Sequence, residues 1–157
     1  MSGRVSAGIL LFRRRGDGVE VLLGHPGGPF FVNKDAGHWS IPKGEVDPDE
    51  ALVDVARREF AEETGHPVPD AELIDLGSIV QKGGKTVHAW AVEGNLDPAT
   101  AHSNMFSMTW PPGSDRREDF PEIDRVAWFE PPEARTRIKP TQIPLIERLL
   151  EALDGVD

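Results

Sequence analysis

The segment 44–66 constrains the fold most, because it carries the signals for both ends of one helix. At its start, Asp47 can cap the first turn, and Pro48 suits the first helical position. At its end, Gly65 favours the left-handed conformation that closes a helix. These signals predict a helix over residues 48–64.

The predicted helix carries glutamate where an amphipathic helix should carry apolar side chains. At about 100° per residue, its apolar positions form one core-facing stripe, made by Leu52, Val55 and Ala56. Glu59, Glu62 and Glu63 continue this stripe along the same edge. Three carboxylates therefore share the inward edge of the helix.

Carboxylates that converge on one edge repel one another and lose hydration, so the arrangement is unfavourable unless cations neutralise it. The chain has no cysteine and the helix has no histidine, so the ligands on offer are oxygens. Oxygen ligands favour Mg²⁺, with Mn²⁺ as an alternative, over Zn²⁺. Arg58 stands four residues before Glu62 and can hold that carboxylate by a charge-assisted bond.

A solvated surface helix is the other interpretation of this segment. Arg and Glu at helical spacing make weak exposed pairs on many such helices. The helix alone does not decide between a metal site and a solvated surface, so the spacing of the whole segment has to be considered.

The whole segment has a fixed pattern that is far more specific than a lone glycine motif. In chain order, its fixed positions are Gly44, Glu50, Arg58, Glu59, Phe60, Glu62, Glu63 and Gly65. This pattern resembles the Nudix box, the signature of hydrolases that act on a nucleoside diphosphate linked to another moiety. Two positions are atypical: His66 stands where the box usually closes on an aliphatic residue, and Phe60 is larger than the usual aliphatic residue. Neither departure touches the glutamates.

The rest of the chain reads as strands followed by a second helix. Apolar runs predict strands at Val5–Arg13, Glu20–Gly24, Trp39–Ile41, Glu72–Val80, Lys85–Val92, Ala101–Trp110 and Arg125–Phe129. Turn residues at Asp17-Gly18 and Gly83-Gly84 predict two hairpins. The segments 25–44 and 112–124 are predicted to be mainly loop.

A final amphipathic helix is predicted from about Ile143 to Leu153. Strands interrupted by one early helix and closed by a late one indicate an α/β fold with a mixed sheet. The resemblance implies, more specifically, the Nudix α/β/α sandwich. At 157 residues the chain suits a single domain over residues 1–157.

The net charge and the N-terminal segment restrict the kinds of partner that the chain is expected to bind. A net charge of −10 argues against an extended nucleic-acid surface, because such binding depends on Lys and Arg neutralising phosphates. An anionic small-molecule nucleotide must then be bound locally, and Lys43, next to Gly44, is the best placed substrate-binding residue. The N-terminal apolar run is too short to span a bilayer, and its arginines follow it. We therefore expect a cytoplasmic protein with no membrane partner.

The resemblance implies a mechanism in which water attacks a phosphorus atom of a pyrophosphate bridge with the help of Mg²⁺. It implies Glu59, Glu62 and Glu63 as metal ligands, together with the carbonyl of Gly44. The general base varies within the family, so it is one of these glutamates or a glutamate from a later loop.

Other candidates follow from their positions in the chain. Glu122 is the first loop candidate for the base and Glu118 the weaker one. Arg58 is placed in the catalytic set through its contact with a metal ligand. Glu50 lies off the metal edge, so its expected role is structural.

The substrate is the least determined property. The stretch GHWSIPKGEV resembles members that hydrolyse nucleoside and dinucleoside polyphosphates. An ADP-ribose or nucleotide-sugar pyrophosphatase is the alternative enzyme, and a catalytically silent nucleotide-binding regulatory module is an alternative of another class. A structural Mg²⁺ helix in an unrelated protein is a further alternative.

Aromatic side chains that could stack a base are better explained by packing; they are Phe31, His88, Trp90, Phe106 and Trp110. The resemblance also leaves a homodimer open.

Overall fold

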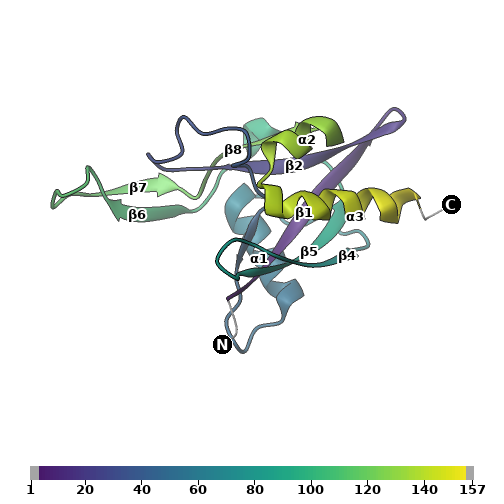
Figure 1. Ribbon diagram of the computed structural model, residues 1–157, viewed down its shortest axis with the longest axis horizontal. Helices are drawn as coiled ribbons and strands as arrows, with labels where there is room; N and C mark the ends of the chain where they lie inside the picture. The colour runs from purple at the N-terminus through teal and green to yellow at the C-terminus, as the bar shows by residue number, and fades with distance from the viewer. Residues whose placement is uncertain (1–3, 155–157) are drawn as a thin grey trace.

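The computed structural model describes residues 4–154, which form a mixed sheet between helices (Figure 1). The strands are β1 (Val5–Arg15), β2 (Gly18–Pro26), β3 (Lys43–Glu45), β4 (Ile74–Val80), β5 (Thr86–Glu93), β6 (Met105–Thr109), β7 (Arg117–Pro121) and β8 (Ile123–Phe129). The helices are α1 (Leu52–Thr64), α2 (Pro131–Arg137) and α3 (Ile143–Asp154), with 3₁₀ turns η1 (Pro98–Thr100) and η2 (Pro140–Gln142). None of the helices within residues 4–154 has the length and apolar content needed to cross a membrane.

The main sheet has the strand order β4-β5-β1-β2-β8. β1 runs parallel to β5, and the other pairs in the sheet are antiparallel. The short strand β3 pairs with the start of β1, where Gly44 lies opposite Ala7. Gly8 is required at this crossing, because a Cβ there would collide with the Pro42 carbonyl. The sheet thus brings the entry to the α1 segment against its central strand.

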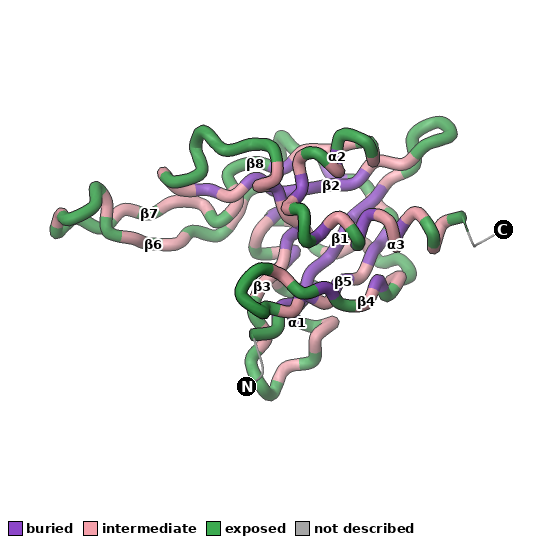
Figure 2. The backbone as a smooth tube through the Cα atoms, in the orientation of Figure 1, coloured by how far each residue is buried: buried purple, intermediate pink, exposed green. Residues whose placement is uncertain are grey.

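Alternate residues of the central strands are buried on opposite faces of the sheet. Leu10 and Phe12 of β1 belong to a core cluster that includes apolar residues of α2 and α3. Ile9 and Leu11 belong to the other cluster, which contains Val55, Ala56 and Phe60 of α1. Burial on both faces is typical of a strand covered by helices on either side. This confirms the predicted α/β/α sandwich with a mixed sheet, and Figure 2 shows the buried central strands.

The predicted hairpins are confirmed, with the first turn at Gly16-Asp17 instead of Asp17-Gly18. Helix α3 is confirmed within one residue of its predicted end. The predicted start of α1 at Pro48 is wrong. Residues 47–50 form a turn in which the Glu50 N–H donates to the Asp47 carbonyl at 3.0 Å, and the helix begins only at Leu52 with no side-chain cap. At the other end, Gly65 has a φ of 76° and closes the helix as predicted.

Two other predicted elements differ from the structure, and one helix was not predicted. The segment 39–41 makes isolated bridges only, and the strand that leads into α1 is β3. Part of the predicted loop 112–124 forms β7, which pairs with β6 as a separate two-stranded ribbon. This ribbon projects from one side of the molecule (Figure 1) and stays partly or fully exposed (Figure 2). Helix α2 was not predicted, because PPEARTR has no apolar periodicity. The single domain over residues 1–157 extends beyond the described residues and stays a prediction.

Candidate metal and nucleotide site

An acidic cavity of about 310 Å³ lies where β3, the last turns of α1 and the base of the β6–β7 ribbon meet. It brings together most of the residues singled out in the sequence. Its lining consists of Ser6, Lys43, Gly44, Glu45, Glu59, Glu63, Lys85, Asn104 and Glu122. Glu62 is exposed beside the cavity, and Arg58 does not line it.

Buried apolar residues of α1 hold the glutamates in place. Val55, Ala56 and Phe60 have no exposed surface, so the face of α1 that they form is fixed against the sheet. Glu59 then lies directly against Gly44, where a Cβ would overlap the Glu59 carboxylate. The backbone of the glycine and the carboxylate of the helix can approach each other only because this side chain is absent.

Burial makes the carboxylates of the cavity costly to ionise. Burial raises the pKa of Glu63 to about 8, although the backbone N–H of Lys43, 3.2 Å away, opposes the shift. Burial, and then the neighbouring Glu62, raise the pKa of Glu59. Burial also raises the pKa of Glu122. Three desolvated carboxylates in one cavity fit the donor chemistry of a hard divalent cation, which would favour their charged forms.

The carboxylates do not yet surround one point. Within residues 4–154, no three Asp, Glu or His side chains are arranged so that they could hold one ion as they stand. Protein donors hold two of the glutamates instead: Arg58 Nε lies 3.6 Å from Glu59, and the Lys43 N–H donates to Glu63.

The predicted partner of Arg58 needs correction. Its guanidinium donates to Glu50, while Glu62 is 4.0 Å away, at the outer limit for an ion pair. Glu50 also accepts from the Asp47 N–H at 3.0 Å. Glu50 therefore links the turn before α1 to Arg58, which agrees with the structural role predicted for it.

The base of the β6–β7 ribbon carries Glu122 to the cavity. The Asn104 N–H donates to the Glu62 carbonyl at 2.8 Å, and the Glu122 N–H donates to the Asn104 carbonyl at 2.9 Å. Glu118, the weaker candidate, lies on β7 and pairs with Arg116 at 3.3 Å, away from the cavity. The separation of these two glutamates depends on the β6–β7 pairing, which the sequence pattern did not reveal.

The candidate aromatic residues lie outside the acidic cavity. Trp90 and His88 stack on each other with ring centroids 4.4 Å apart, and His88 binds Asp75 at 2.7 Å. Phe106 packs near Phe120, with ring centroids 6.0 Å apart, and Trp110 contacts Phe30. Sequence reasoning missed Lys85 and Asn104, which do line the cavity. The only feature of the sequence that marks Lys85 is its residue type, because lysine is rare in this chain, with five lysines against twelve arginines.

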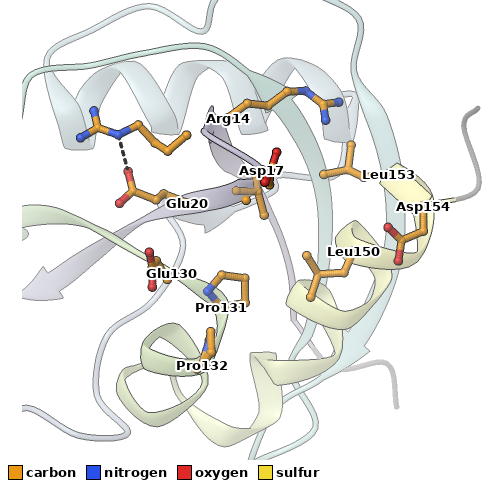
Figure 3. Close-up of a pocket in the computed structure, with 12 residues that line it drawn as sticks. Arg14, Asp17, Glu20, Glu130, Pro131, Pro132, Leu150, Leu153 and Asp154 are labelled. Atoms are coloured by element: carbon orange, nitrogen blue, oxygen red, sulfur yellow. Dashed lines mark ion pairs between the residues drawn. The ribbon is translucent and has the colours of Figure 1, made fainter.

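A larger cavity of about 450 Å³ lies elsewhere, between the β1–β2 turn and α3 (Figure 3). Arg14, Asp17, Glu20 and Glu130 give it mixed charge, and Glu20 is 3.9 Å from Arg15. It contains none of the glutamates of α1. Its charged side chains are of both signs, so it offers no focused site for an anion or a cation.

Sequence comparison places this site in a known family. The family model for the NUDIX domain matches residues 3–149. Over 99 residues the chain is 30% identical to the asymmetrical bis(5'-nucleosyl)-tetraphosphatase of Mus musculus, a match covering 56% of this chain and 63% of that enzyme. Over 102 residues it is 32% identical to an octanoyltransferase of Myxococcus xanthus, covering 65% of this chain and 25% of that protein. The chain thus spans less than two thirds of these curated relatives.

Solved structures share the fold. An Ap4A hydrolase of C. elegans in a binary complex has a TM-score of 0.67 at 22% identity, covering 96% of this chain and 98% of that one. The NUDIX domain of Shewanella oneidensis NrtR, complexed with ADP ribose, has a TM-score of 0.65 at 19% identity, covering 98% and 90% of the two chains.

Proposed function

The chain belongs to the Nudix family, and from this premise we propose that it is a pyrophosphohydrolase whose substrate is a nucleoside or dinucleoside polyphosphate. The observation that carries the proposal is the convergence of Gly44, Glu59, Glu63 and Glu122 with Lys43 on one cavity. A silent binding module would have no need of so many desolvated carboxylates. The match to the mouse tetraphosphatase supports a polyphosphate substrate.

Glu59, Glu62, Glu63 and the carbonyl of Gly44 would hold Mg²⁺ or Mn²⁺ in this proposal. When bound, such an ion supplies positive charge beside the phosphates. Lys43, which lines the same cavity, would contact a phosphate oxygen. Arg58 would limit the movement of Glu59 and Glu62, because it lies within 4.0 Å of both.

Glu122 is the base that we propose. The oxygen of water attacks phosphorus, the bridging P–O bond breaks, and Glu122 accepts the proton of the water. A carboxyl whose pKa is raised by burial is a better base near neutral pH than an exposed one. Glu63 is the alternative, because it lies in the same cavity with a pKa of about 8.

The test is Mg²⁺-dependent hydrolysis of nucleoside triphosphates, diadenosine polyphosphates, ADP-ribose and nucleotide sugars, with products separated by ion-exchange chromatography. We expect selective turnover of the polyphosphates. Turnover of ADP-ribose or nucleotide sugars alone would select the alternative enzyme. Binding of nucleotide without any turnover would select the regulatory module.

Substitution then tests the site. Glu122→Gln should lower kcat by roughly 10²–10⁴-fold, the usual contribution of a general base. Glu118→Gln is the matched control and should stay near the wild-type value, because Glu118 does not line the cavity. Wild-type kcat in Glu122→Gln with loss in Glu63→Gln would move the base to Glu63.

A further inference from the structure

The lysines of this protein are distributed differently from its arginines. In residues 4–154, every side-chain ion pair closer than 4.0 Å is made by Arg or His, and none by Lys. The chain has 27 Asp and Glu residues, so partners are abundant. Yet four of its five lysines line two adjoining cavities: Lys43, Lys82, Lys85 and Lys139. Lys43 has the charges of Glu63 and Glu45 nearby, whereas no carboxylate lines the cavity that Lys82, Lys85 and Lys139 share. Ammonium groups gathered in this way repel one another unless an anion covers them.

Three of these residues, Lys82, Lys85 and Lys139, line a cavity of about 850 Å³, which we call the lysine pocket. His38, Gln81 and Thr141 are its other polar lining residues, and Val80 and Pro140 contribute apolar surface. Lys85 also lines the acidic cavity, so the two cavities adjoin at this side chain. Lys43 stands on the acidic side of that junction.

A buried glutamine holds the two sides of the lysine pocket together. Gln142 has no exposed surface, and its Nε2 donates to Gln81 Oε1 and to Ser40 Oγ, each at 2.9 Å. The Gln81 N–H in turn donates to the Lys85 carbonyl at 2.6 Å, which closes the β4–β5 turn. These bonds join the turn that carries Lys82 and Lys85 to the η2 segment that follows Lys139. The pocket is thus built before any ligand arrives.

The surroundings of Lys139 also indicate an anionic ligand. Lys139 is half-buried, and its N–H donates to the Trp39 carbonyl at 2.8 Å, which fixes its backbone. Burial, and then the charge of Lys85, lower the pKa of the Lys139 ammonium. Phosphate oxygens would restore the hydrogen bonds and the opposite charge that this group has lost.

We propose that the lysine pocket binds the phosphate groups of the substrate that extend beyond the acidic cavity, so that the protein selects chains of three or more phosphates. A substrate with only two bridging phosphates would place both of them beside the carboxylates of the acidic cavity, and no phosphate would reach the lysine pocket. A single carboxylate ligand would not need three ammonium groups. The proposal rests on the proposed function, because it takes the acidic cavity as the place of cleavage.

The first measurement is the affinity of the 157-residue chain for inorganic tripolyphosphate without Mg²⁺, by isothermal titration calorimetry, with orthophosphate as the comparison. Lys139→Gln should weaken tripolyphosphate binding about tenfold, the effect of losing about 1.4 kcal/mol from a charged contact. Lys34→Gln is the control, because it removes the same charge from the one lysine that lines neither cavity. Thermal unfolding of each variant shows that the fold is kept.

The second measurement compares kcat/KM for diadenosine tetraphosphate and ADP-ribose. Lys139→Gln should lower kcat/KM about tenfold for the tetraphosphate and less than twofold for ADP-ribose. Equal losses for both substrates, or tripolyphosphate binding that is unchanged in Lys139→Gln, would overturn the proposal. If the wild type binds tripolyphosphate through Lys139 but hydrolyses nothing, the proposed function fails and the lysine pocket stands.

Discussion

At the scale of single residues, the site depends on side chains held where they are energetically unfavourable. Glu63 is half-buried near Glu59, and its carboxylate accepts one backbone N–H as compensation. Gly44 has the opposite role, because the absence of its side chain makes room for Glu59. Both features lower stability or leave it unchanged, so their explanation lies in function.

Gly44→Ala should separate activity from stability. The new Cβ would displace the Glu59 carboxylate, which is the flexible end of a side chain, so the backbone need not move. We expect turnover to fall at least about tenfold, because small misplacements of a site group carry such costs, and the melting temperature to change little. The control is Gly18→Ala, whose Cβ would be 3.7 Å from the nearest atom, the Arg15 carbonyl oxygen. A large loss of stability in Gly44→Ala alone would show that the close contact is structural.

Glu63 should make the metal-free protein less stable as pH rises. Its pKa is about 8 in the folded protein against an ordinary value of 4.5, so the folded state holds the proton more tightly. The unfolded chain therefore releases this proton first, and the free energy of unfolding falls between about pH 4.5 and pH 8. Urea unfolding at pH 5 and pH 8 should show a smaller decrease in Glu63→Gln than in the wild type. An identical decrease in both proteins would mean that Glu63 ionises normally.

At the scale of elements, the buried face of α1 determines where the glutamates on its edge lie. Its buried face includes Phe60, an atypical residue for the Nudix box, which has no exposed surface. The base of the β6–β7 ribbon is tied to the end of the same helix through the Asn104 N–H. The glutamates of α1 and Glu122 are therefore positioned by one helix and its contacts.

Phe60→Ala should destabilise the protein by about 3–5 kcal/mol, the usual cost of removing a buried aromatic ring. The resulting cavity lies under α1, so turnover should fall as well. Phe30→Ala is the control, because Phe30 is 58% exposed and its loss should cost much less. Chemical unfolding of the two variants measures the difference. Equal stability of Phe60→Ala and the wild type would contradict the packing described for α1.

At the scale of the whole molecule, an acidic protein concentrates a few cations beside one acidic cavity. The net charge is −10, yet four lysines gather around the acidic cavity and the lysine pocket. The arginines are mostly paired on the surface, where ion pairs contribute little to stability. The arginines thus lie mainly in surface ion pairs, whereas these lysines line the cavities proposed to bind the ligand.

If Mg²⁺ binds as proposed, it should stabilise the whole fold, because only folding brings its carboxylate ligands together. At one hundred times its dissociation constant, a ligand of the folded state alone adds about 2.7 kcal/mol to the free energy of unfolding. A thermal shift with Mg²⁺ should be largest in the wild type and smaller in Glu62→Gln and Glu63→Gln. Removal of Mg²⁺ with a chelator should abolish turnover. An equal thermal shift in the wild type and both variants would place the ion elsewhere.

The sequence by itself determined the features that lie within one element. The glutamate edge of α1, the closure of that helix at Gly65 and the two main-sheet hairpins follow from local spacing, because helix and turn geometry repeat over a few residues. The burial of β1 and β2 on both faces also follows from their continuous apolar runs. The start of α1 did not follow from local spacing, because the turn at residues 47–50 competes with the helix for the same hydrogen bonds.

Only the tertiary structure decided which distant segments meet. β7 has one large apolar side chain, Phe120, among charged residues, and α2 lacks an apolar stripe, so neither has a periodic signal. The distinction between Glu122 and Glu118, and the meeting of Lys85 with Lys139, depend on strand pairing and on the buried Gln142. Such contacts join residues far apart in the chain, and local propensity carries no information about which of them will pair.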